Sequence, residues 1–388
     1  MIIKRNILYM SLLATLQLFA CTEKNTVEIV GKKTVTDSDT AIAAVDDSVR
    51  SFMQKHSIPG VSIAIVKNGK LVYAKGYGYA DQSAATPVTD SSRFRISSIS
   101  KCVTSVAIMK LLAAGTLSLD DKIFGPGSIL GTQYGTLPYG TYITDLRVRH
   151  LLQHYNGGWS NASNDPTLTN DAMNAEQLIS WILDNRPLSS APGTTYLYSN
   201  VGYMILGRVI EKLTGQTYEN YVKTNVLQPS GITAMDIGGS TLADRKTNEV
   251  VYYGQGGQNP YGENFTRRDA NGGWIASPTD MMRLMVHVDG LSSVPDILTP
   301  AIKDTMITPF FANQAYACGW NISAQGSWYH AGSFPGSSSF WMRRNDGMSG
   351  IALVNSRSTS SAFSNDLLQL VQRMLLSSTI AWPNVDLF

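Results

Sequence analysis

The chain has 388 residues, and its 31 lysines and arginines exceed its 29 aspartates and glutamates by only two. This length allows one large domain or two modest ones, and either would bury a sizeable core. Because the basic residues are spread without long runs, the sequence lacks the clustered basic face that nucleic-acid binding requires, and we expect no nucleic-acid partner.

The N-terminal residues resemble a bacterial export signal. Two positive charges in "MIIKR" precede an apolar run that is too short and too sharply ended for a membrane-spanning helix. The run ends in "LFAC", Leu18–Cys21, which resembles the lipobox of bacterial lipoproteins. We therefore predict a lipoprotein signal peptide over residues 1–20 and lipidation of Cys21. The alternative is a plain secretory signal that is cleaved nearby, in which Cys21 has no special role.

Residues 21–43 are polar and threonine-rich and show no apolar periodicity. Such a segment behaves as a flexible tether with a reach of about 25 Å. Several acyl chains on Cys21 would anchor the protein stably in a membrane. The expected location is therefore the cell envelope, on the periplasmic or surface face of the outer membrane if the cell is Gram-negative, with a single folded domain over residues 44–388.

After the tether, strand and helix patterns follow one another. The first pattern is a β-hairpin, in which Val61–Val66 and Leu71–Gly76 flank the turn signal Asn68-Gly69. Helical periodicity then dominates, over Ser98–Ala114, Leu146–His154, Ala175–Asn185, Asn200–Thr214 and Pro278–Val288. Strand patterns return over residues 317–323, 327–332 and 338–356, with a turn signal at Asp346-Gly347, and residues 364–378 form a last amphipathic helix.

Strands at both ends of the chain enclose this helical middle, which indicates an α+β fold. The terminal segments would share an antiparallel sheet flanked by helices, and a helical subdomain would pack beside it. Two cysteines, Cys102 and Cys318, lie far apart in the sequence and do not form a disulfide framework. Cys102 falls early in a predicted amphipathic helix, which favours a buried thiol, and pairing with Cys318 stays open.

The segment "FRISSISK", residues 94–101, places three serines before a lysine at the start of that helix. Residues three apart share a helix face, so Ser98 and Lys101 would meet one turn apart. Ser97 lies four residues before Lys101, and spacing alone does not choose between the two serines. On its own, S-x-x-K is common by chance and indicates only a cap and a surface lysine.

Two later motifs indicate a function for the S-x-x-K pattern. Tyr198–Asn200 precedes a predicted helix, and His330–Gly332 lies on a predicted strand. In order and separation, S-x-x-K, Y-x-N and H-x-G resemble the motifs of the penicillin-recognising serine hydrolases. That family comprises class C β-lactamases, related D-alanyl-D-alanine carboxypeptidases and D-aminopeptidases, and family VIII esterases. The resemblance implies a β-lactamase/transpeptidase-like fold whose helical subdomain carries the nucleophile.

The resemblance extends beyond the three motifs, from about Ile58 to Leu376. The segment "TDLRVRHLLQHYNGG" is similar to a family helix and turn that usually end in His-x-Ser-Gly, and here Asn156 replaces the serine. The segment "NGGWIASPTDMMRLM" is similar to the family's Gly-Gly loop and following helix.

The resemblance implies a role for each motif residue. Ser98 would be the nucleophile, and a neutral hydroxyl needs a neighbouring base. Lys101 and Tyr198 would share the acid–base work, because which of the two acts as base is disputed within the family. Burial and nearby positive charge would have to lower the pKa of Lys101, since a lysine near its ordinary pKa is protonated. Asn200 would orient Lys101 and bind the substrate amide.

The third motif would complete the site. The backbone N–H groups of Ser98 and Ser333 would stabilise the oxyanion, and Gly332 and Ser333 would contact the substrate. His330 departs from the lysine of most β-lactamases, which weakens the case for efficient β-lactam hydrolysis. If His330 contributes positive charge to a substrate carboxylate or helps tune Tyr198, we expect its protonation to matter between about pH 5 and 8. The alternative is a neutral imidazole that only fills space and donates one hydrogen bond.

Other chemistries fit the sequence less well. His150 and His154 have a metal-like spacing, but Leu151 stands where a zinc protease needs glutamate, so we expect no metal and assign both histidines to packing and capping. No G-x-S-x-G motif is present, and no cofactor is expected.

We therefore expect a serine hydrolase that acts through an acyl-enzyme on a small-molecule or peptide substrate, most simply an amide ending in D-alanine. The alternatives are a carboxylesterase or weak β-lactamase with the same machinery, and a penicillin-binding or sensor protein without turnover.

Overall fold

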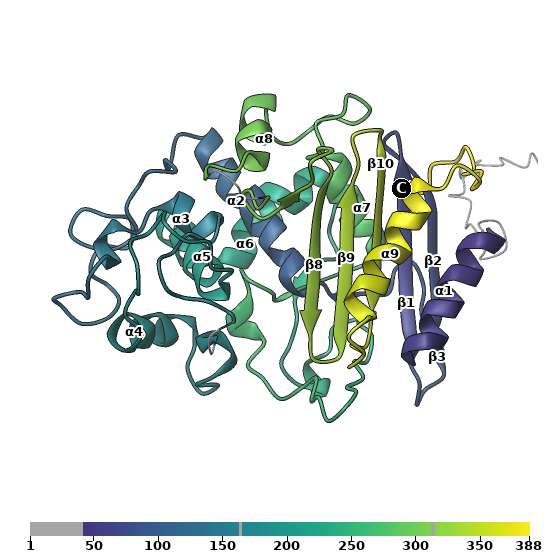
Figure 1. The fold of residues 1–388 in the computed structure, drawn as a ribbon, viewed down its shortest axis with the longest axis horizontal. Helices are drawn as coiled ribbons and strands as arrows, with labels where there is room; N and C mark the ends of the chain where they lie inside the picture. Colours follow the sequence, from purple (N-terminus) through teal and green to yellow (C-terminus); the bar gives the residue numbers. More distant parts are fainter. Residues whose placement is uncertain (1–41, 163–164, 312–314) are drawn as a thin grey trace, which may run out of the picture. The chain divides into compact units, whose positions relative to one another are not determined.

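The centre of the fold is a seven-stranded antiparallel sheet to which both ends of the chain contribute (Figure 1). The structure, a computed structural model, describes residues 42–162, 165–311 and 315–388. The strand order is β3-β2-β1-β10-β9-β8-β7, which places the N-terminal hairpin beside the C-terminal strands. The strands are β1 Gly60–Lys67, β2 Lys70–Asp81, β3 Thr86–Pro87, β7 Asn321–Ile322, β8 Trp328–Phe334, β9 Ser337–Arg343 and β10 Met348–Val354. The α+β class expected from the sequence is confirmed.

The predicted signal peptide, Cys21 and nearly all of the tether lie outside the described residues, so the predictions made for them stay predictions. Within the described ranges, no helix is both long enough and apolar enough to cross a membrane.

The two predicted turn signals lie next to each other. Asn68 and Gly69 have φ values of 51° and 79°, as a tight two-residue hairpin turn requires, and Gly347 has a φ of 82° in the β9–β10 turn. The N–H of Asn68 donates to the carbonyl of Gly347 at 2.8 Å. The turns meet because β1 pairs with β10 in antiparallel register, from Val61 opposite Val354 to Lys67 opposite Met348.

Two helices from opposite ends of the chain cover one face of the sheet (Figure 1). They are α1 (Ala43–His56), which the sequence analysis did not predict, and α9 (Phe363–Leu376), which coincides closely with the last predicted helix. Their apolar side chains join those of β1 and β10 in one buried cluster. Helix α7 (Pro278–Val286) packs on β1 and β10 as part of a second, larger cluster.

Helix α2 (Ser100–Ala113) begins two residues after Ser98, directly after the 3₁₀ turn η1 (Ser97–Ile99). The sequence pattern predicts an amphipathic helix here, but every residue from Ser100 to Met109 is buried. The reason is its position, because α2 contacts α5, α6 and α8 on different sides. This burial explains how a lysine near the start of the helix is removed from water.

The other predicted helices agree with the structure to different degrees. Ala175–Asn185 and Asn200–Thr214 are helices α4 and α5 at the predicted bounds. The helix predicted over Leu146–His154 is the shorter α3 (Val148–Leu152), and the chain has left the helix at His154, whose φ is 64°.

The remaining elements are short. They are α6 Tyr218–Val222, α8 Pro300–Ile307, the 3₁₀ turns η2 Ile143–Asp145, η3 Pro166–Leu168, η5 Gln228–Ser230, η6 Leu242–Asp244 and η7 Thr266–Arg268, the π-helical η4 Lys223–Leu227, and a small sheet of β4 Phe94–Arg95, β6 Trp274–Ala276 and β5 Asp236–Ile237.

Candidate active site

Ser98 lies in the turn η1, which β9 holds in place. Ser97 has a φ of 51°, a left-handed conformation that non-glycine residues seldom adopt. The hydroxyl of Ser339 donates to the carbonyl of Ile96 at 2.9 Å, and the hydroxyls of Ser97 and Ser337 lie 3.1 Å apart. Both serines line a cavity, but the hydroxyl of Ser97 is engaged with the sheet, whereas the hydroxyl of half-buried Ser98 lies 3.2 Å from Nζ of Lys101. The structure thus distinguishes Ser98 from Ser97 as the candidate nucleophile, which the spacing to Lys101 alone did not.

Lys101 is completely buried, and three oxygen atoms surround its ammonium nitrogen. Its Nζ lies 3.2 Å from Oγ of Ser98, 2.7 Å from Oδ1 of Asn200 and 2.9 Å from the carbonyl oxygen of Asn271. The first two partners are predicted site residues. Asn271 begins the "NGG" segment noted in the sequence, but a backbone acceptor leaves no side-chain signal by which to predict it.

The pKa of Lys101 is lowered from its ordinary value to about 7. The main cause is burial, which disfavours the charged form, and the positive charge of Arg268 adds to it, while Asp165 acts in the opposite direction. Near neutral pH a substantial fraction of this lysine is therefore an uncharged amine.

Tyr198 packs over the same ammonium group, with its ring centre 4.9 Å from Nζ of Lys101. Burial raises the pKa of Tyr198 well above its ordinary value, and a hydrogen bond with Ser98 opposes this only in part. The phenol is therefore protonated at neutral pH. A protonated phenol can act as a general acid, but it cannot act as a general base until it has lost its proton.

Asn200 is the first residue of α5, and its side chain is held in one orientation. Its Nδ2 donates to Oδ2 of Asp165 at 2.6 Å, which leaves Oδ1 directed at Lys101. The buried Asp165 also accepts hydrogen bonds from the N–H and hydroxyl of Thr167. Asp165 was missed in the sequence analysis, because a single carboxylate in a loop carries no pattern.

His154 holds the segment that carries Tyr198. Its carbonyl accepts from the N–H of Leu197 at 2.7 Å, and its Nδ1 accepts from the N–H of Ser199 at 3.2 Å. Its ring centre lies 4.3 Å from that of Tyr198. His154 therefore has the predicted packing role, and the residue that it packs against is the site residue Tyr198. The capping role fits His150, whose Nδ1 accepts from the N–H of Arg147.

His330 is buried on β8, and the structure contradicts the expectation that it titrates between pH 5 and 8. Its Nδ1 lies 2.7 Å from the carbonyl oxygen of Ala331, and its Nε2 lies 3.1 Å from the hydroxyl of Tyr316. Burial, together with the charge of Lys101, lowers the pKa of His330 to about 3. A neutral ring that donates from Nδ1 and accepts at Nε2 satisfies both contacts, so His330 brings no positive charge to the site.

Gly332 and Ser333 lie where β8 passes closest to η1. A Cβ atom on Gly332 would stand 2.3 Å from the carbonyl oxygen of Ile96 and 2.2 Å from Oγ of Ser339, so only glycine fits. Phe334 and Ser337 flank the two-residue turn before β9, which makes them a hydrogen-bonded pair. The next pair is then not hydrogen-bonded, and the N–H of Ser333 points away from β9.

That N–H points to an open edge of the sheet. Among the described residues, β7 pairs only with Trp328 and Tyr329, so beyond Tyr329 the edge of β8 opposite β9 has no strand beside it. The N–H of Ser333 is therefore available to a group bound between β8 and η1, as an oxyanion donor must be.

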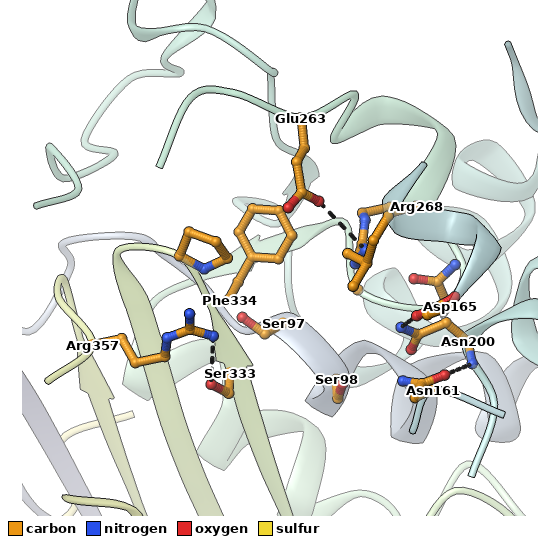
Figure 2. A pocket seen from close by; sticks show the side chains of 14 residues that line it. Ser97, Ser98, Asn161, Asp165, Asn200, Glu263, Arg268, Ser333, Phe334 and Arg357 are labelled. Carbon is orange, nitrogen blue, oxygen red and sulfur yellow. Dashed lines mark hydrogen bonds and ion pairs between the residues drawn. The ribbon is translucent and has the colours of Figure 1, made fainter. Parts of the chain in front are cut away.

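The cavity in front of Ser98 has a volume of about 300 Å³. Figure 2 shows Ser98 and Asn200 on one side, Ser333 and Arg357 on another, and Glu263 and Arg268 above them. The lining residues are Ser97, Ser98, Asn161, Asp165, Leu168, Asn200, Glu263, Arg268, Asn271, Gly272, Ser333, Phe334, Pro335 and Arg357. Its charged members are Asp165, Glu263, Arg268 and Arg357, and none of them was predicted; Arg268 ends the turn η7 and the other three lie in loops.

The two cysteines of the domain are both buried free thiols, which answers the question that their spacing left open. The hydrogen bond from Sγ of Cys102 to the carbonyl of Gly319 is 2.9 Å long. Burial raises the pKa of Cys318 to about 12. Neither thiol is therefore an activated nucleophile. No group of three or more histidines, cysteines or carboxylates in the described ranges has an arrangement that would hold a metal ion.

Comparisons with known proteins show the family and the fold. The family model described as beta-lactamase matches residues 45–373. Protein flp of Staphylococcus aureus strain N315 is 25% identical over 80% of this chain, which covers 63% of that protein. The chain thus spans less than two thirds of the length of this curated relative. Penicillin-binding protein 4* of Bacillus subtilis strain 168 is 25% identical over 85% of the chain and 75% of its own length.

The fold has solved counterparts as well. The D-amino acid amidase of Ochrobactrum anthropi SV3 superposes with a TM-score of 0.68 at 22% identity, over 85% of this chain and 99% of that one. At this identity the likeness shows the fold, which is the β-lactamase/transpeptidase-like arrangement of sheet and helices. The family model covers far more than half of the chain. The protein therefore belongs to the beta-lactamase family of serine hydrolases.

Proposed function

We propose that this protein hydrolyses amide bonds of D-configured substrates, such as D-alanyl-D-alanine peptides or D-amino acid derivatives, through an acyl-enzyme on Ser98. The observation that carries the proposal is the contact of 3.2 Å between Oγ of Ser98 and the buried amine of Lys101. A weak hydroxyl nucleophile needs such a base within hydrogen-bonding distance.

The geometry favours Lys101 over Tyr198 as the base. An uncharged amine has two hydrogens and one lone pair. The two hydrogens of Lys101 have acceptors in Asn200 and the carbonyl of Asn271, which leaves the lone pair for the hydroxyl of Ser98. The raised pKa of Tyr198 makes its phenolate scarce at neutral pH.

A complete reaction follows from these assignments. The hydroxyl of Ser98 adds to the substrate carbonyl and gives its proton to Lys101. The N–H groups of Ser98 and Ser333 bind the oxyanion. Tyr198 gives its phenolic proton to the leaving amine as the C–N bond breaks, and it recovers a proton from Lys101. Water then hydrolyses the ester on Ser98 and restores the free hydroxyl.

Two observations support an amide substrate of D configuration. The structural counterparts include proteins described as a D-amino acid amidase and a D-stereospecific amidohydrolase, and the curated relatives include a penicillin-binding protein. The neutral His330 removes the cation that an efficient β-lactamase would place in the third motif.

A parallel assay tests the proposal. Purified protein is given a D-alanyl-D-alanine peptide, a D-amino acid amide and its L enantiomer, nitrocefin and a short-chain nitrophenyl ester, and an acyl probe is followed by mass spectrometry on Ser98. We expect release of D-alanine or of ammonia from the D substrates and little from the L amide. Turnover of the ester alone would establish a carboxylesterase, and a stable acyl adduct without turnover would establish a binding protein.

We further propose that Cys21 anchors the protein in the cell envelope, on the basis of "LFAC" and the polar segment that follows it. In cells, Cys21→Ala should move the protein from the membrane fraction to the soluble fraction. A wild-type protein that is soluble and carries no acyl chains by mass spectrometry would refute the anchor.

A further inference from the structure

A chain of hydrogen bonds leads from Lys101 to the segment that carries Asp165. Nζ of Lys101 donates to Oδ1 of Asn200 at 2.7 Å, and Nδ2 of Asn200 donates to Oδ2 of Asp165 at 2.6 Å. Oδ1 of Asp165 accepts from the hydroxyl of Thr167 at 2.8 Å, and that hydroxyl accepts from Nη2 of Arg268 at 3.4 Å. Figure 2 shows Asp165 between Asn200 and Arg268. The chain thus connects the base of the proposed mechanism with two charged side chains.

The far end of this chain fixes the direction of its hydrogen bonds. The guanidinium of Arg268 can only donate. Asp165 accepts three hydrogen bonds on its two oxygens, and a carboxylate has no proton to donate. Asn200 must therefore turn its NH₂ group to Asp165 and its Oδ1 to Lys101, because the reverse orientation would place two acceptors against each other.

The orientation of Asn200 matters for the lone pair of Lys101. With Oδ1 toward it, the uncharged amine donates to Asn200 and keeps its lone pair for the hydroxyl of Ser98. With the amide reversed, Nδ2 would donate to the same lone pair and compete with that hydroxyl. The carboxylate behind Asn200 therefore keeps the base available.

Asp165 also acts on Lys101 through its charge. Burial and the positive charge of Arg268 lower the pKa of Lys101, and the negative charge of Asp165 opposes them. Glu263 is the ion-pair partner of Arg268, at 3.6 Å. Burial keeps the other titratable groups around Lys101 uncharged near neutral pH, since it raises the pKa of a thiol or phenol and lowers that of an imidazole; these groups are Cys102, His154, Tyr198, Tyr203 and His330.

Arg267 holds the segment 165–173, which Asp165 begins. Its Nη groups donate to the carboxylate of Asp171 and to four backbone carbonyls of the segment, those of Thr167, Thr169, Asn170 and Met173. Arg267 and Arg268 are neighbours in η7, so one turn both anchors this segment and supplies the charge that Asp165 opposes. Asp165 is therefore held in place by contacts within the protein.

We propose that Asp165 is a positioning residue, which orients the amide of Asn200 and so keeps the lone pair of Lys101 free for the nucleophile. Its negative charge also offsets that of Arg268, so that the amine titrates near neutral pH. The inference rests on the proposed function, because Lys101 needs a free lone pair only if it is the base for Ser98.

The pH dependence of acylation tests this role. The rate at which one nitrophenyl ester acylates Ser98 is measured by mass spectrometry from pH 5 to 9. A nitrophenolate leaves without a proton, so this rate depends on the base and not on a general acid. In Asp165→Asn, the midpoint of the acid limb should move to lower pH, by about one unit, because loss of the negative charge favours the uncharged amine. The plateau rate should fall by about 10- to 100-fold, because the amide of Asn200 is then free to reverse.

Three further variants make the test specific. Arg268→Gln removes the opposing charge and should move the midpoint to higher pH. Asp171→Asn is the matched control, because it makes the same chemical change in the same segment on a half-exposed side chain that contacts Arg267, and the midpoint should stay near 7. If Asp165→Asn does not fold, Asp165→Ser leaves room for a water and should show the same two changes.

The two proposals fail in different ways. If the wild type is acylated on Ser98 with a midpoint near 7 and Asp165→Asn keeps that midpoint, the proposed machinery stands and the role of Asp165 is overturned, even if the plateau rate falls. An equal shift in Asp171→Asn overturns it as well. If the wild type takes no label on Ser98, the proposed function falls and the role of Asp165 falls with it.

Discussion

Two buried bases lie on opposite sides of Ser98, Lys101 on the helical wall of the site and His330 on its sheet wall, and burial has opposite consequences for their proton chemistry. On the helical wall, burial lowers the pKa of Lys101 from 10.5 to about 7. On the sheet wall, burial lowers the pKa of His330 from 6.5 to about 3. The physical effect is the same, since the charged form loses its hydration. The lysine becomes able to exchange protons near neutral pH, whereas the histidine loses that ability.

The two walls therefore have different roles in the proposed mechanism. The helical wall moves protons, because Lys101 has a lone pair directed at Ser98 and Tyr198 holds a phenolic proton. The sheet wall fixes geometry, because β8 contributes the close approach of Gly332 and the outward N–H of Ser333. Substitutions on the helical wall should therefore alter the pH dependence of activity. Substitutions on the sheet wall should alter only the shape of the site.

The largest effect is expected from Ser98→Ala, which removes the nucleophile that the helical wall serves. Covalent labelling should disappear, and turnover should fall on the order of 10⁴-fold or more. Thermal stability should change little, since only a hydroxyl is lost. Ser97→Ala is the matched control, because Ser97 contacts Ser337 and not Lys101, and it should keep the label. The opposite result for the two serines would mean that the nucleophile was placed one residue too far along the chain.

Lys101→Met should cost about 10²–10⁴-fold in turnover, the range for loss of a general base. In the wild type, kcat/KM should fall as pH decreases through about 7, because only the uncharged amine accepts the proton of Ser98. A pH–rate profile measures this directly. An acid limb with the same midpoint in Lys101→Met would assign the ionisation to another group.

The same substitution makes a prediction about stability. Between about pH 7 and 10.5 the folded wild-type protein binds fewer protons than the unfolded chain, because the pKa of Lys101 is lowered on folding. The free energy of unfolding of the wild type, measured relative to Lys101→Met, should therefore rise with pH across this window. Chemical denaturation of both proteins at pH 6.5 and pH 9 compares a pH below this window with one inside it. A difference that stays constant or falls would show that Lys101 is not desolvated.

Gly332→Ala tests the sheet wall. The added Cβ would force β8 away from Ile96 and Ser339, displacing the N–H of Ser333, and loss of one oxyanion donor costs about 10²–10³-fold in kcat. Crowding at this contact should also lower the free energy of unfolding by about 1–3 kcal/mol. Gly140→Ala is the matched control, because a Cβ at Gly140 meets no other atom. Full activity in Gly332→Ala would mean that the approach of β8 to η1 does not matter.

His330→Gln should have the smallest effect. Since burial lowers the pKa of His330 to about 3, its removal should leave the midpoint of the acid limb near 7 and reduce kcat/KM by less than about tenfold. Comparing the pH–rate profiles of wild type and variant is sufficient. If the acid limb vanished in His330→Gln, the two walls would share the proton chemistry and the comparison would fail.

The sequence predicted those features that depend on neighbours along the chain. The hairpin at Asn68-Gly69 and the helices α4 and α5 follow from turn chemistry and apolar periodicity, which are local. For helix α2 the sequence pattern predicts the position correctly but indicates an amphipathic helix. Its burial on all sides comes from α5, α6 and α8, and its own sequence does not contain that information.

The site divides in the same way. The sequence determined which residues carry the proposed chemistry, because the S-x-x-K, Y-x-N and H-x-G motifs place Ser98, Lys101 and Tyr198 in recognisable order. Only the tertiary structure decided their protonation states. The pKa values depend on burial and on charges such as that of Arg268, which lies 167 residues after Lys101 in the chain. The tertiary structure likewise decided that His330 is neutral, because burial lowers its pKa to about 3. Desolvation and through-space charge act over distances that a motif does not record.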